Sequence, residues 1–369
     1  MKLNASKLLI FITFLCCFML PTYFFNNTLG IDLVEYLFLI ISMLIYFVVI
    51  IIDKKISKFE FFSTIVILIL CIIRKSIIPL YLIELLIAYR LTENFIKNEI
   101  VISKKNLIVS IFFIVLYSLI YFGYNGRYIY TGLREINQCG FAIFMLFLII
   151  RKRNKKIGNI LLLLGNLTFS RNYLLCLVFF LIIEKLKTTK LFNKIYKYLN
   201  FKNLLILSVG LLLFFAFLFE NAYKNNLLSD YQTGFKRYLN IYDYSNYFRF
   251  SINKKLIDIY MNNPSYLLTG LNDEKFYELS YNYSVDNSIP YRRIKPHNYF
   301  FSYFRIYGIF SIIIFIILGK IMKRLVNKNN ISILLVIFIY ANILGIGFAN
   351  YWLFLTIITL SVYRKESEE

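Results

Sequence analysis

The sequence is poor in the residues that build metal and redox sites. It contains one histidine, His297, and its five cysteines show no CxxC spacing. A His-rich metal site and paired-histidine chemistry are therefore excluded. The cysteines lie in or beside apolar runs, which is typical of small hydrophobic residues rather than of a zinc site or a disulfide framework. We expect the protein to use neither a metal ion nor a cofactor.

Charged residues are scarce as well. Only 17% of the 369 residues are charged, whereas 59% are hydrophobic and 19% are aromatic. Average globular domains have about 25% charged residues. So small a polar fraction cannot cover a water-soluble core, and the same composition excludes a disordered chain and a coiled coil. The remaining class is an all-α fold, a polytopic helical membrane protein.

Apolar runs predict about twelve transmembrane helices. Several runs are shorter than the ~20 residues that cross a bilayer, and two consecutive pairs form tight hairpins. The predicted spans are 8–25, 33–52, 60–74, 77–90, 106–122, 136–150, 157–169, 172–184, 203–219, 299–318, 331–346 and 350–363.

The charge balance is strongly positive, with 42 Lys and Arg against 20 Asp and Glu. These cations lie between the apolar runs, which is typical of the positive-inside rule rather than of nucleic-acid binding. With a cytoplasmic N-terminus, the short outer loops hold only Arg74, Lys75, Arg127, Arg134 and Arg171. We therefore predict that both termini are cytoplasmic, and we interpret the first apolar run as a retained helix rather than a signal peptide.

One long polar segment interrupts the helices and divides the chain into three parts. We predict a membrane bundle of about nine helices over 1–219 and a large outer loop over 220–298. A second membrane bundle of about three helices, with a short cytoplasmic tail, follows over 299–369. Inside the loop, residues 246–262 predict an amphipathic helix lying at the membrane interface, and Pro264 ends it. Its apolar stripe comprises Phe248, Ile252, Leu256, Ile259 and Tyr260.

Three features on the predicted outer side could carry chemistry. Arg171 lies at the turn of a short hairpin, and Arg249 begins the amphipathic helix. Each also has a simpler interpretation, as an arginine that snorkels at a helix end or contacts a lipid headgroup. His297 stands before the tenth helix and can accept a proton near neutral pH, although a lone histidine is more often structural. Arg305, inside that helix, should face a polar cavity because a buried cation is costly in a bilayer.

Two carboxylates, Glu35 and Glu84, lie within predicted membrane helices. Intramembrane carboxylates can relay protons in transporters, but they can also hydrogen-bond between packed helices. Without a patterned set of partners they indicate a transporter only weakly.

Four short motifs occur in a fixed order along the chain. They are "REINQCGFAIFM" at 134–145, "LTFSRNYLL" at 167–175, "RFSINKKLIDIYMNNPSYLLTGLN" at 249–272 and "PHNYFFSYFRIYGIF" at 296–310. In this order, and with the large outer loop between them, they resemble the Wzy-type polysaccharide polymerases of the O-antigen polymerase/ligase superfamily. Those proteins act in bacterial O-antigen, capsule and exopolysaccharide pathways. The chain departs from the family pattern where a Trp often follows the loop Arg, and it has one glycine, Gly270, where the family has a pair.

The resemblance implies glycosyl transfer at the outer face of the bacterial cytoplasmic membrane. The donor would be a sugar chain on undecaprenyl pyrophosphate, and the acceptor a hydroxyl of the next lipid-linked unit. Arg171 and Arg249 would bind the pyrophosphate, because a guanidinium can bind phosphate oxygens bidentately. His297 would act as the base on the acceptor hydroxyl or orient it. Further substrate-binding candidates are Arg134, Asn137, Ser170, Arg292, Asn298 and Arg305.

The implied partners are the lipid-linked oligosaccharide, the membrane, and a flippase and chain-length regulator of the same pathway, with no nucleic acid. Two other functions stay open. A ligase that moves finished glycan to another acceptor would share these motifs. A flippase or transporter for lipid-linked oligosaccharides would also have twelve helices, but it would need short loops and a polar path through the bilayer.

Overall fold

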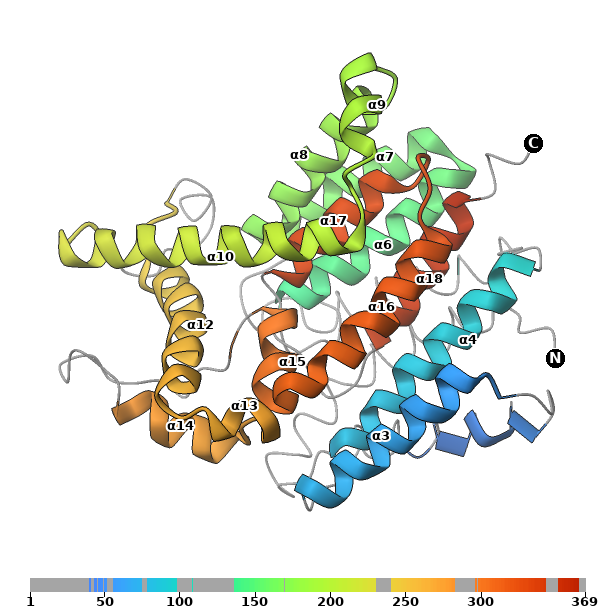
Figure 1. Ribbon diagram of the computed structural model, residues 1–369. Helices are drawn as coiled ribbons and strands as arrows, with labels where there is room; N and C mark the ends of the chain where they lie inside the picture. The colour runs from blue at the N-terminus through green and yellow to red at the C-terminus, as the bar shows by residue number, and fades with distance from the viewer. Residues whose placement is uncertain are drawn as a thin grey trace. The chain divides into compact units, whose positions relative to one another are not determined.

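The computed structural model of the protein is shown in Figure 1. It describes residues 56–74, 78–97, 136–168, 170–229, 240–282, 296, 298–342 and 351–364, with short stretches between 40 and 51 and residue 108. The predicted helices at 8–25, 33–52 and 106–122 lie outside the described residues, apart from these few positions.

Every named element in the described part of the chain is an α-helix or a 3-10 helix, so the all-α class is confirmed there. The first half contains α3 (Lys58–Arg74), η1 (Ile78–Leu82), α4 (Ile83–Lys97), α6 (Ile136–Arg153), α7 (Lys155–Leu164), η2 (Gly165–Thr168), α8 (Arg171–Leu186) and α9 (Lys190–Tyr196). The second half contains α10 (Phe201–Lys224), α12 (Tyr244–Asn262), α13 (Ser265–Thr269), α14 (Asp273–Asn282), α15 (Tyr299–Tyr307), η3 (Gly308–Phe310), α16 (Ser311–Leu325), α17 (Ile331–Ala341) and α18 (Tyr351–Arg364).

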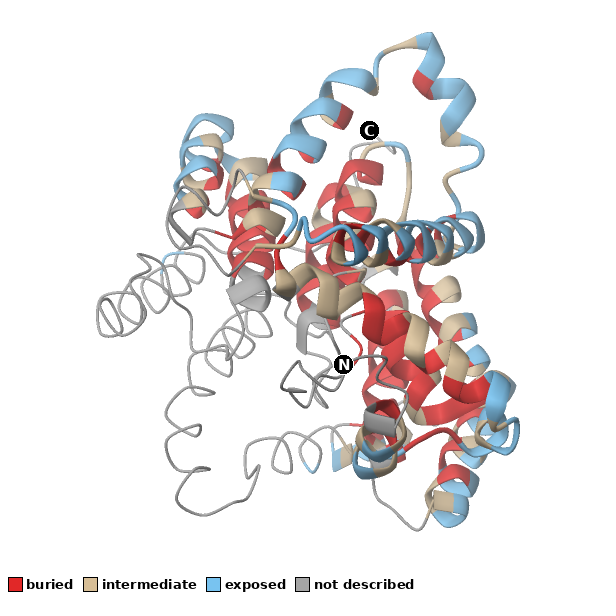
Figure 2. Ribbon diagram, turned by 90° about the vertical axis from the view of Figure 1, so that its left-hand side faces the viewer, coloured by how far each residue is buried: buried red, intermediate tan, exposed pale blue. Residues whose placement is uncertain are grey.

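Two stretches of the described chain are long and apolar enough to cross a bilayer. They are α10, with 24 residues, and the helical run Tyr299–Leu325, with 27 residues. Large apolar side chains on α10, such as Ile206 and Phe217, are exposed, as is expected for a helix that faces lipid. Figure 2 shows helices along which buried and exposed residues alternate. By length and composition these stretches favour a membrane protein, and the count of twelve helices stays a prediction.

The helices cluster into two compact units. Unit 1 covers Met1–Asn193, Ile317–Ile337 and Gly347–Glu369, and unit 2 covers Lys194–Ile316 and Phe338–Ile346.

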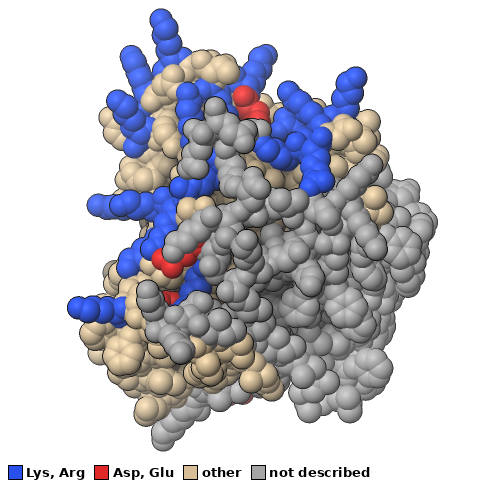
Figure 3. Space-filling view, turned by 90° about the vertical axis from the view of Figure 1, so that its right-hand side faces the viewer, with Lys and Arg blue, Asp and Glu red and all other residues tan. Residues whose placement is uncertain are grey.

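In unit 1, α6 packs against α7, α8 and α18, and α4 also packs against α18. Phe144 of α6 makes edge-to-face contacts with Tyr173 and Phe180 of α8, with ring centroids 5.6 and 5.7 Å apart. The hydroxyl of Tyr173 donates a hydrogen bond to the carbonyl of Leu162 at 2.8 Å. On the face seen in Figure 3, Lys and Arg side chains project from the described residues and few Asp or Glu side chains lie among them.

In unit 2, the predicted amphipathic helix is present as α12, which runs from α10 towards α13 and α14 (Figure 1). Its predicted stripe is buried at Ile252, Leu256, Ile259 and Tyr260. These residues pack with side chains of α10, α14 and α15, so the apolar face of α12 is covered by protein. The helix ends at Asn262, and Pro264 begins the next short helix rather than extending this one.

The predicted helix 77–90 ends too early. The structure has a 3-10 turn followed by α4, which continues to Lys97. The charged residues after 89 indicate a loop by composition alone. In the folded unit, however, Arg90 pairs with Glu60 of α3, and Glu93 pairs with Arg324 of α16 at 2.8 Å. Partners from other helices therefore keep these charged residues helical.

The predicted helix 299–318 is longer than expected and is interrupted. It extends to Leu325, and η3 separates α15 from α16. Gly308 adopts a φ of 55°, in the left-handed region that favours glycine. The interruption places Arg305 in the last turn of a short helix rather than inside a continuous span.

Candidate functional site

The candidate site of unit 2 is built around the guanidinium of Arg305. The side chain is only 4% exposed, and its Nη2 lies 2.7 Å from Oδ1 of Asp273, whose side chain is 34% exposed. Its Cζ lies 5.3 Å from the ring centroid of Phe276. Both partners belong to α14, so an element of the predicted outer loop holds a cation of the predicted tenth helix.

The backbone at Arg305 is held by the same loop. The amide of Leu271 donates to the Arg305 carbonyl at 2.6 Å. The hydroxyl of Tyr260 on α12 lies 2.9 Å from the Phe304 carbonyl and 3.0 Å from the Arg305 carbonyl, and donates to this pair. The end of α15 is therefore fastened from two sides, which restricts the directions that the guanidinium can take.

A reciprocal glycine contact brings the loop this close to α15. Gly270 has a φ of 72°, and a Cβ there would lie 2.1 Å from the carbonyl oxygen of Ile306. Gly308 has a φ of 55°, and a Cβ there would lie 2.2 Å from the carbonyl oxygen of Leu267. Each glycine thus supplies both a left-handed backbone and the space for the opposite chain. This explains why the third and the fourth sequence motif each contain a glycine at this position.

Only one of the three guanidinium nitrogens of Arg305, Nη2, has a polar partner among the described residues. Its Nε and Nη1 are buried and have no hydrogen-bond partner among the described residues. A buried N–H group without a partner costs on the order of 1–3 kcal/mol, more when it is charged. The free edge of a guanidinium fits two oxygens of a phosphate or carboxylate. The arrangement can therefore bind an oxyanion without a metal ion.

Arg249 lies on the helix that contacts this site. It is half-buried near the start of α12, and its carbonyl accepts a hydrogen bond from Nδ2 of Asn253 at 2.7 Å. Tyr260, the α12 residue that touches Arg305, is three turns further along, about 16 Å at the helical rise. Oδ1 of the buried Asn253 has no hydrogen-bond partner among the described residues. Arg249 thus lies on the helix whose Tyr260 contacts the backbone of α15 at Arg305.

Asn298 is engaged in the fold. It caps α15 by accepting a hydrogen bond from the amide of Phe301 at 3.0 Å. Its Nδ2 donates to Oδ1 of Asn342 at 2.9 Å, and Nδ2 of Asn342 donates to Oγ of Ser208 at 2.8 Å. These bonds tie the start of α15 to α10 and to the end of α17. These hydrogen bonds alone explain why an asparagine occupies position 298. The role of Asn298 in substrate binding stays a prediction.

In unit 1, the Ser-Arg turn begins α8. Oγ of Ser170 accepts a hydrogen bond from the amide of Tyr173 at 3.3 Å, so Ser170 is the N-cap of the helix. Arg171 is the first residue of α8 and is partly exposed. A cation is unfavourable at the positive end of a helix dipole. An anion placed there would interact favourably with both the helix end and Arg171.

Several sequence predictions lie outside the described residues. These are His297, Arg134, Arg292 and Glu35. Asn137 lies in the first turn of α6, but its side chain is outside the described part. Glu84 is buried at the start of α4.

Sequence reasoning missed Asp273 and Phe276. Asp273 opens α14, where an acidic residue is expected for the helix dipole alone, so its type gave no signal of a partner. It lies far from Arg305 in the sequence, and no local periodicity links the two. The Gly270 and Gly308 positions were the available signal, because both occur in motifs singled out from the sequence.

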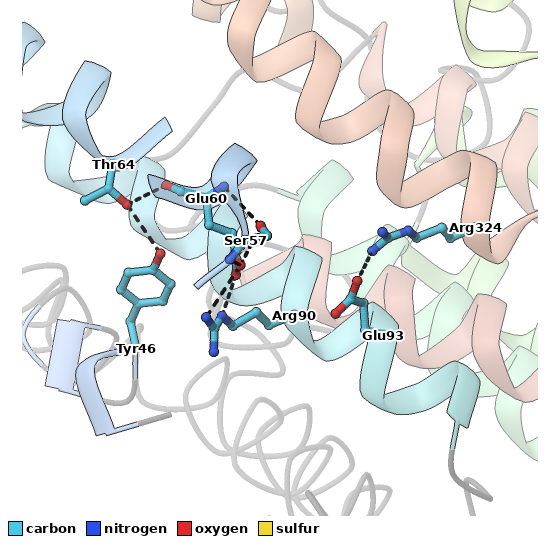
Figure 4. A network of polar contacts seen from close by, with 7 residues as sticks. All are labelled: Tyr46, Ser57, Glu60, Thr64, Arg90, Glu93 and Arg324. Atoms are coloured by element: carbon cyan, nitrogen blue, oxygen red, sulfur yellow. Dashed lines mark hydrogen bonds and ion pairs between the residues drawn. The ribbon is translucent and has the colours of Figure 1, made fainter. Parts of the chain in front are cut away.

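A second buried arginine, in unit 1, has a different environment (Figure 4). Arg90 is paired with Glu60, whose Oε2 accepts hydrogen bonds from the amide of Ser57 at 3.0 Å and from its Oγ at 2.7 Å. The amide of Glu60 donates to Oγ of Ser57 at 3.2 Å, which completes a capping box at the start of α3. Nearby, Oγ1 of Thr64 lies 3.3 Å from the hydroxyl of Tyr46. This cluster joins the start of α3 to α4 by an ion pair and hydrogen bonds that stabilise the fold of unit 1.

No protein-family model matches the chain, and neither a curated protein nor a solved structure matches it.

Proposed function

We propose that the protein polymerises oligosaccharide repeat units linked to undecaprenyl pyrophosphate, at the outer face of a bacterial cytoplasmic membrane. The observation that carries the proposal is the order of the four motifs around the large polar loop. The guanidinium of Arg305 supports it, because it lies where the third and fourth motifs meet and two of its nitrogens have no hydrogen-bond partner among the described residues.

The proposed topology has about twelve transmembrane helices with both termini in the cytoplasm. Contacts within unit 1 support it, since they join segments that the sequence assigns to one side. Arg324 after the tenth predicted helix pairs with Glu93 after the fourth. Arg364 at the end of α18 donates to the carbonyl of Arg324, and Lys187 after α8 pairs with Glu184 and donates to the carbonyl of Asn329.

In the proposed reaction, an acceptor hydroxyl attacks the anomeric carbon of the donor sugar. The bond from that carbon to the pyrophosphate oxygen breaks, and undecaprenyl pyrophosphate leaves with the electron pair. His297 takes the hydroxyl proton or orients the acceptor. Arg171 and Arg249 stabilise the leaving pyrophosphate, with Arg134, Arg292 and Arg305 as further cations. Each charge-assisted bond contributes about 1.5–3 kcal/mol, so that several of them can replace a metal ion.

The test is to replace His297 by Ala in the full-length protein and to separate lipid-linked sugars from cells by size. We expect long polymer to disappear and single repeat units to accumulate. Arg153→Gln is the control, because Arg153 is an exposed residue at the predicted cytoplasmic end of α6. Normal chain lengths in the His297 variant would remove this residue from the site. Normal lengths in Arg171→Gln and Arg249→Gln as well would overturn the proposed function.

The cell assay and a second assay in vesicles together separate the alternative functions. Loss of a ligase leaves long glycan that is not attached to its final acceptor. A flippase moves labelled lipid-linked sugar across a vesicle membrane without lengthening it. Purified protein that lengthens the glycan in vesicles therefore distinguishes the polymerase from both.

A further inference from the structure

The segment between α8 and the first turn of α10 carries an unbalanced positive charge. Residues 185–202 contain six lysines and no acidic residue. Lys194, Lys197 and Lys202 belong to unit 2 and are exposed, and we call these three residues the basic rim. No ion pair joins them to an acidic side chain among the described residues. Their charge is therefore available to a ligand outside the chain.

Exposed apolar side chains run beside the basic rim. Ile195 is 45% exposed and Tyr198 is 70% exposed, and Leu191 is exposed too. Positions 191, 195 and 198 have the i, i+4, i+7 spacing of one helical face, and the amide of Tyr198 continues the turn by donating to the Ile195 carbonyl at 2.9 Å. The lysines at 190, 194 and 197 repeat the same spacing one position earlier. An apolar row and a cationic row therefore lie next to each other, as in helices that bind membrane surfaces.

Lys202 adds a second, independent feature. It lies in the first turn of α10, whose backbone N–H groups form the positive end of the helix dipole. A lysine is unfavourable at this end, whereas an anion is favourable. Bound phosphate would interact with both the lysine and the helix end.

The segment is held in a fixed position relative to α10. Nδ2 of Asn203 donates to the carbonyl of Tyr198 at 2.9 Å, and the amide of Asn203 donates to Oδ1 of Asn200 at 3.0 Å. In the next turns of α10, Ile206 and Leu207 are exposed apolar residues of a candidate membrane span. The apolar row thus lies immediately before a surface that is expected to face lipid.

We propose that the basic rim binds the headgroups of anionic phospholipids, with Ile195 and Tyr198 inserted between them. The charge of the rim selects anionic headgroups, and the adjacent apolar row and lipid-facing helix select a bilayer over a soluble anion. This site does not depend on the proposed polymerase activity, since it uses none of the residues assigned to glycosyl transfer.

The test uses the full-length protein in nanodiscs of phosphatidylcholine alone or of an equimolar mixture with phosphatidylglycerol. Hydrogen–deuterium exchange of the backbone amides between Lys190 and Asn200 reports whether the segment is held at the bilayer. We expect slower exchange in the mixture, by about five-fold for each lysine that engages a headgroup. The triple variant K194Q/K197Q/K202Q should exchange equally fast in both lipids.

The matched control is K58Q/K323Q/K328Q, which removes the same charge from exposed lysines elsewhere in the described chain. It should keep the dependence on phosphatidylglycerol. Unchanged exchange in α12 shows that each variant is folded. Equal exchange of the wild-type segment in both lipids would overturn the proposal. So would a control variant that loses the dependence on phosphatidylglycerol as fully as the triple variant does. The variant I195S/Y198S keeps every lysine, and full protection in it would refute insertion of the apolar row.

Discussion

Arg90 in unit 1 and Arg305 in unit 2 are both buried arginines paired with a carboxylate, yet their environments differ. Glu60, the partner of Arg90, is itself buried and is fixed by two hydrogen bonds from Ser57 (Figure 4). Asp273, the partner of Arg305, is partly exposed, and two nitrogens of Arg305 have no partner among the described residues.

The difference separates a structural cation from a candidate binding cation. A buried ion pair contributes to a fold only when additional hydrogen bonds satisfy both groups, and the Arg90 cluster meets this condition. The Arg305 guanidinium does not, although Tyr260, Leu271 and both glycines hold its backbone firmly. A rigidly positioned group with unused donors is what a binding site requires.

The largest effect is expected from Glu60→Gln, which breaks the well-satisfied pair. It leaves the buried Arg90 without a countercharge and weakens the capping box of α3. Removing one partner of a buried pair costs about 3–5 kcal/mol. Thermal unfolding of the purified protein in detergent measures this loss. Glu278→Gln is the control, because the Lys275–Glu278 pair is exposed and should contribute less than about 1 kcal/mol.

An equally small loss in both glutamate variants would contradict the structural role of the Arg90 cluster. The double variant E60Q/R90M provides a further check. Because it removes the uncompensated charge, it should be less destabilised than Glu60→Gln alone.

The next largest effect concerns the contact that brings the loop to Arg305. Gly308→Ala places a side chain at a left-handed φ and against the carbonyl of Leu267, and such strain costs on the order of 1–3 kcal/mol. Gly210→Ala is the matched control, because a Cβ there meets nothing within 4 Å and alanine favours a helix. We expect a lower unfolding temperature for the first variant and an equal or higher one for the second. The reverse order would show that the glycine contact does not support the fold.

Much of this architecture could be predicted from the sequence because it follows from local patterns. The predicted helix 246–262 agrees with α12 at both ends to within two residues, since a polar loop makes a 3.6-residue stripe easy to recognise. The lengths of α4 and of the run that ends at Leu325 could not be predicted. They depend on the pairs Arg90–Glu60 and Arg324–Glu93, which join distant parts of the chain.

The candidate site was predictable only in part. Arg305 could be singled out from the sequence because a charged side chain within an apolar run is energetically costly. Arg305 pairs with Asp273, and the polar cavity expected around it stays a prediction. The pairing depends on how the loop folds back, which no spacing in the sequence encodes. Composition likewise gives no sign that the apolar face of α12 is covered by other helices rather than by lipid.

A smaller change in stability is expected from Asp273→Asn. Asparagine keeps the shape and an acceptor oxygen but removes the countercharge of Arg305, which should cost about 1 kcal/mol at this partly exposed position. Under the proposed function, polymer yield should fall about five-fold, because the loss of an orienting contact worth about 1 kcal/mol is close to a factor of five in rate.

Glu274→Gln is the control for Asp273→Asn. Both acids lie in the first turn of α14 and interact equally with its dipole, but Glu274 is exposed. If both variants lower stability and yield alike, the effect arises from the helix end and not from Arg305. A loss of stability without a loss of yield would restrict Asp273 to the fold.

The smallest effect concerns Lys255 on α12 in unit 2. Burial lowers its pKa to about 8, although the nearby carboxylates Glu220 and Asp258 act in the opposite direction. Between pH 8 and the ordinary lysine pKa near 10.5, the folded protein therefore binds fewer protons at this site than the unfolded chain. The contribution of Lys255 to the free energy of unfolding must therefore rise with pH through that window. Below that window the amine is charged in both states, and the full cost of burying the charge is present.

Unfolding temperatures of wild type and Lys255→Gln, measured in detergent from pH 7.5 to 9.5, test this sign. The unfolding temperature of the wild type should rise relative to that of the variant as the pH rises. Lys254→Gln is the control, because Lys254 is more exposed and pairs with Glu220 at 2.8 Å. A constant difference between wild type and Lys255→Gln would mean that the amine stays solvated on α12. In that case the apolar packing of unit 2 would not extend to this face of the helix.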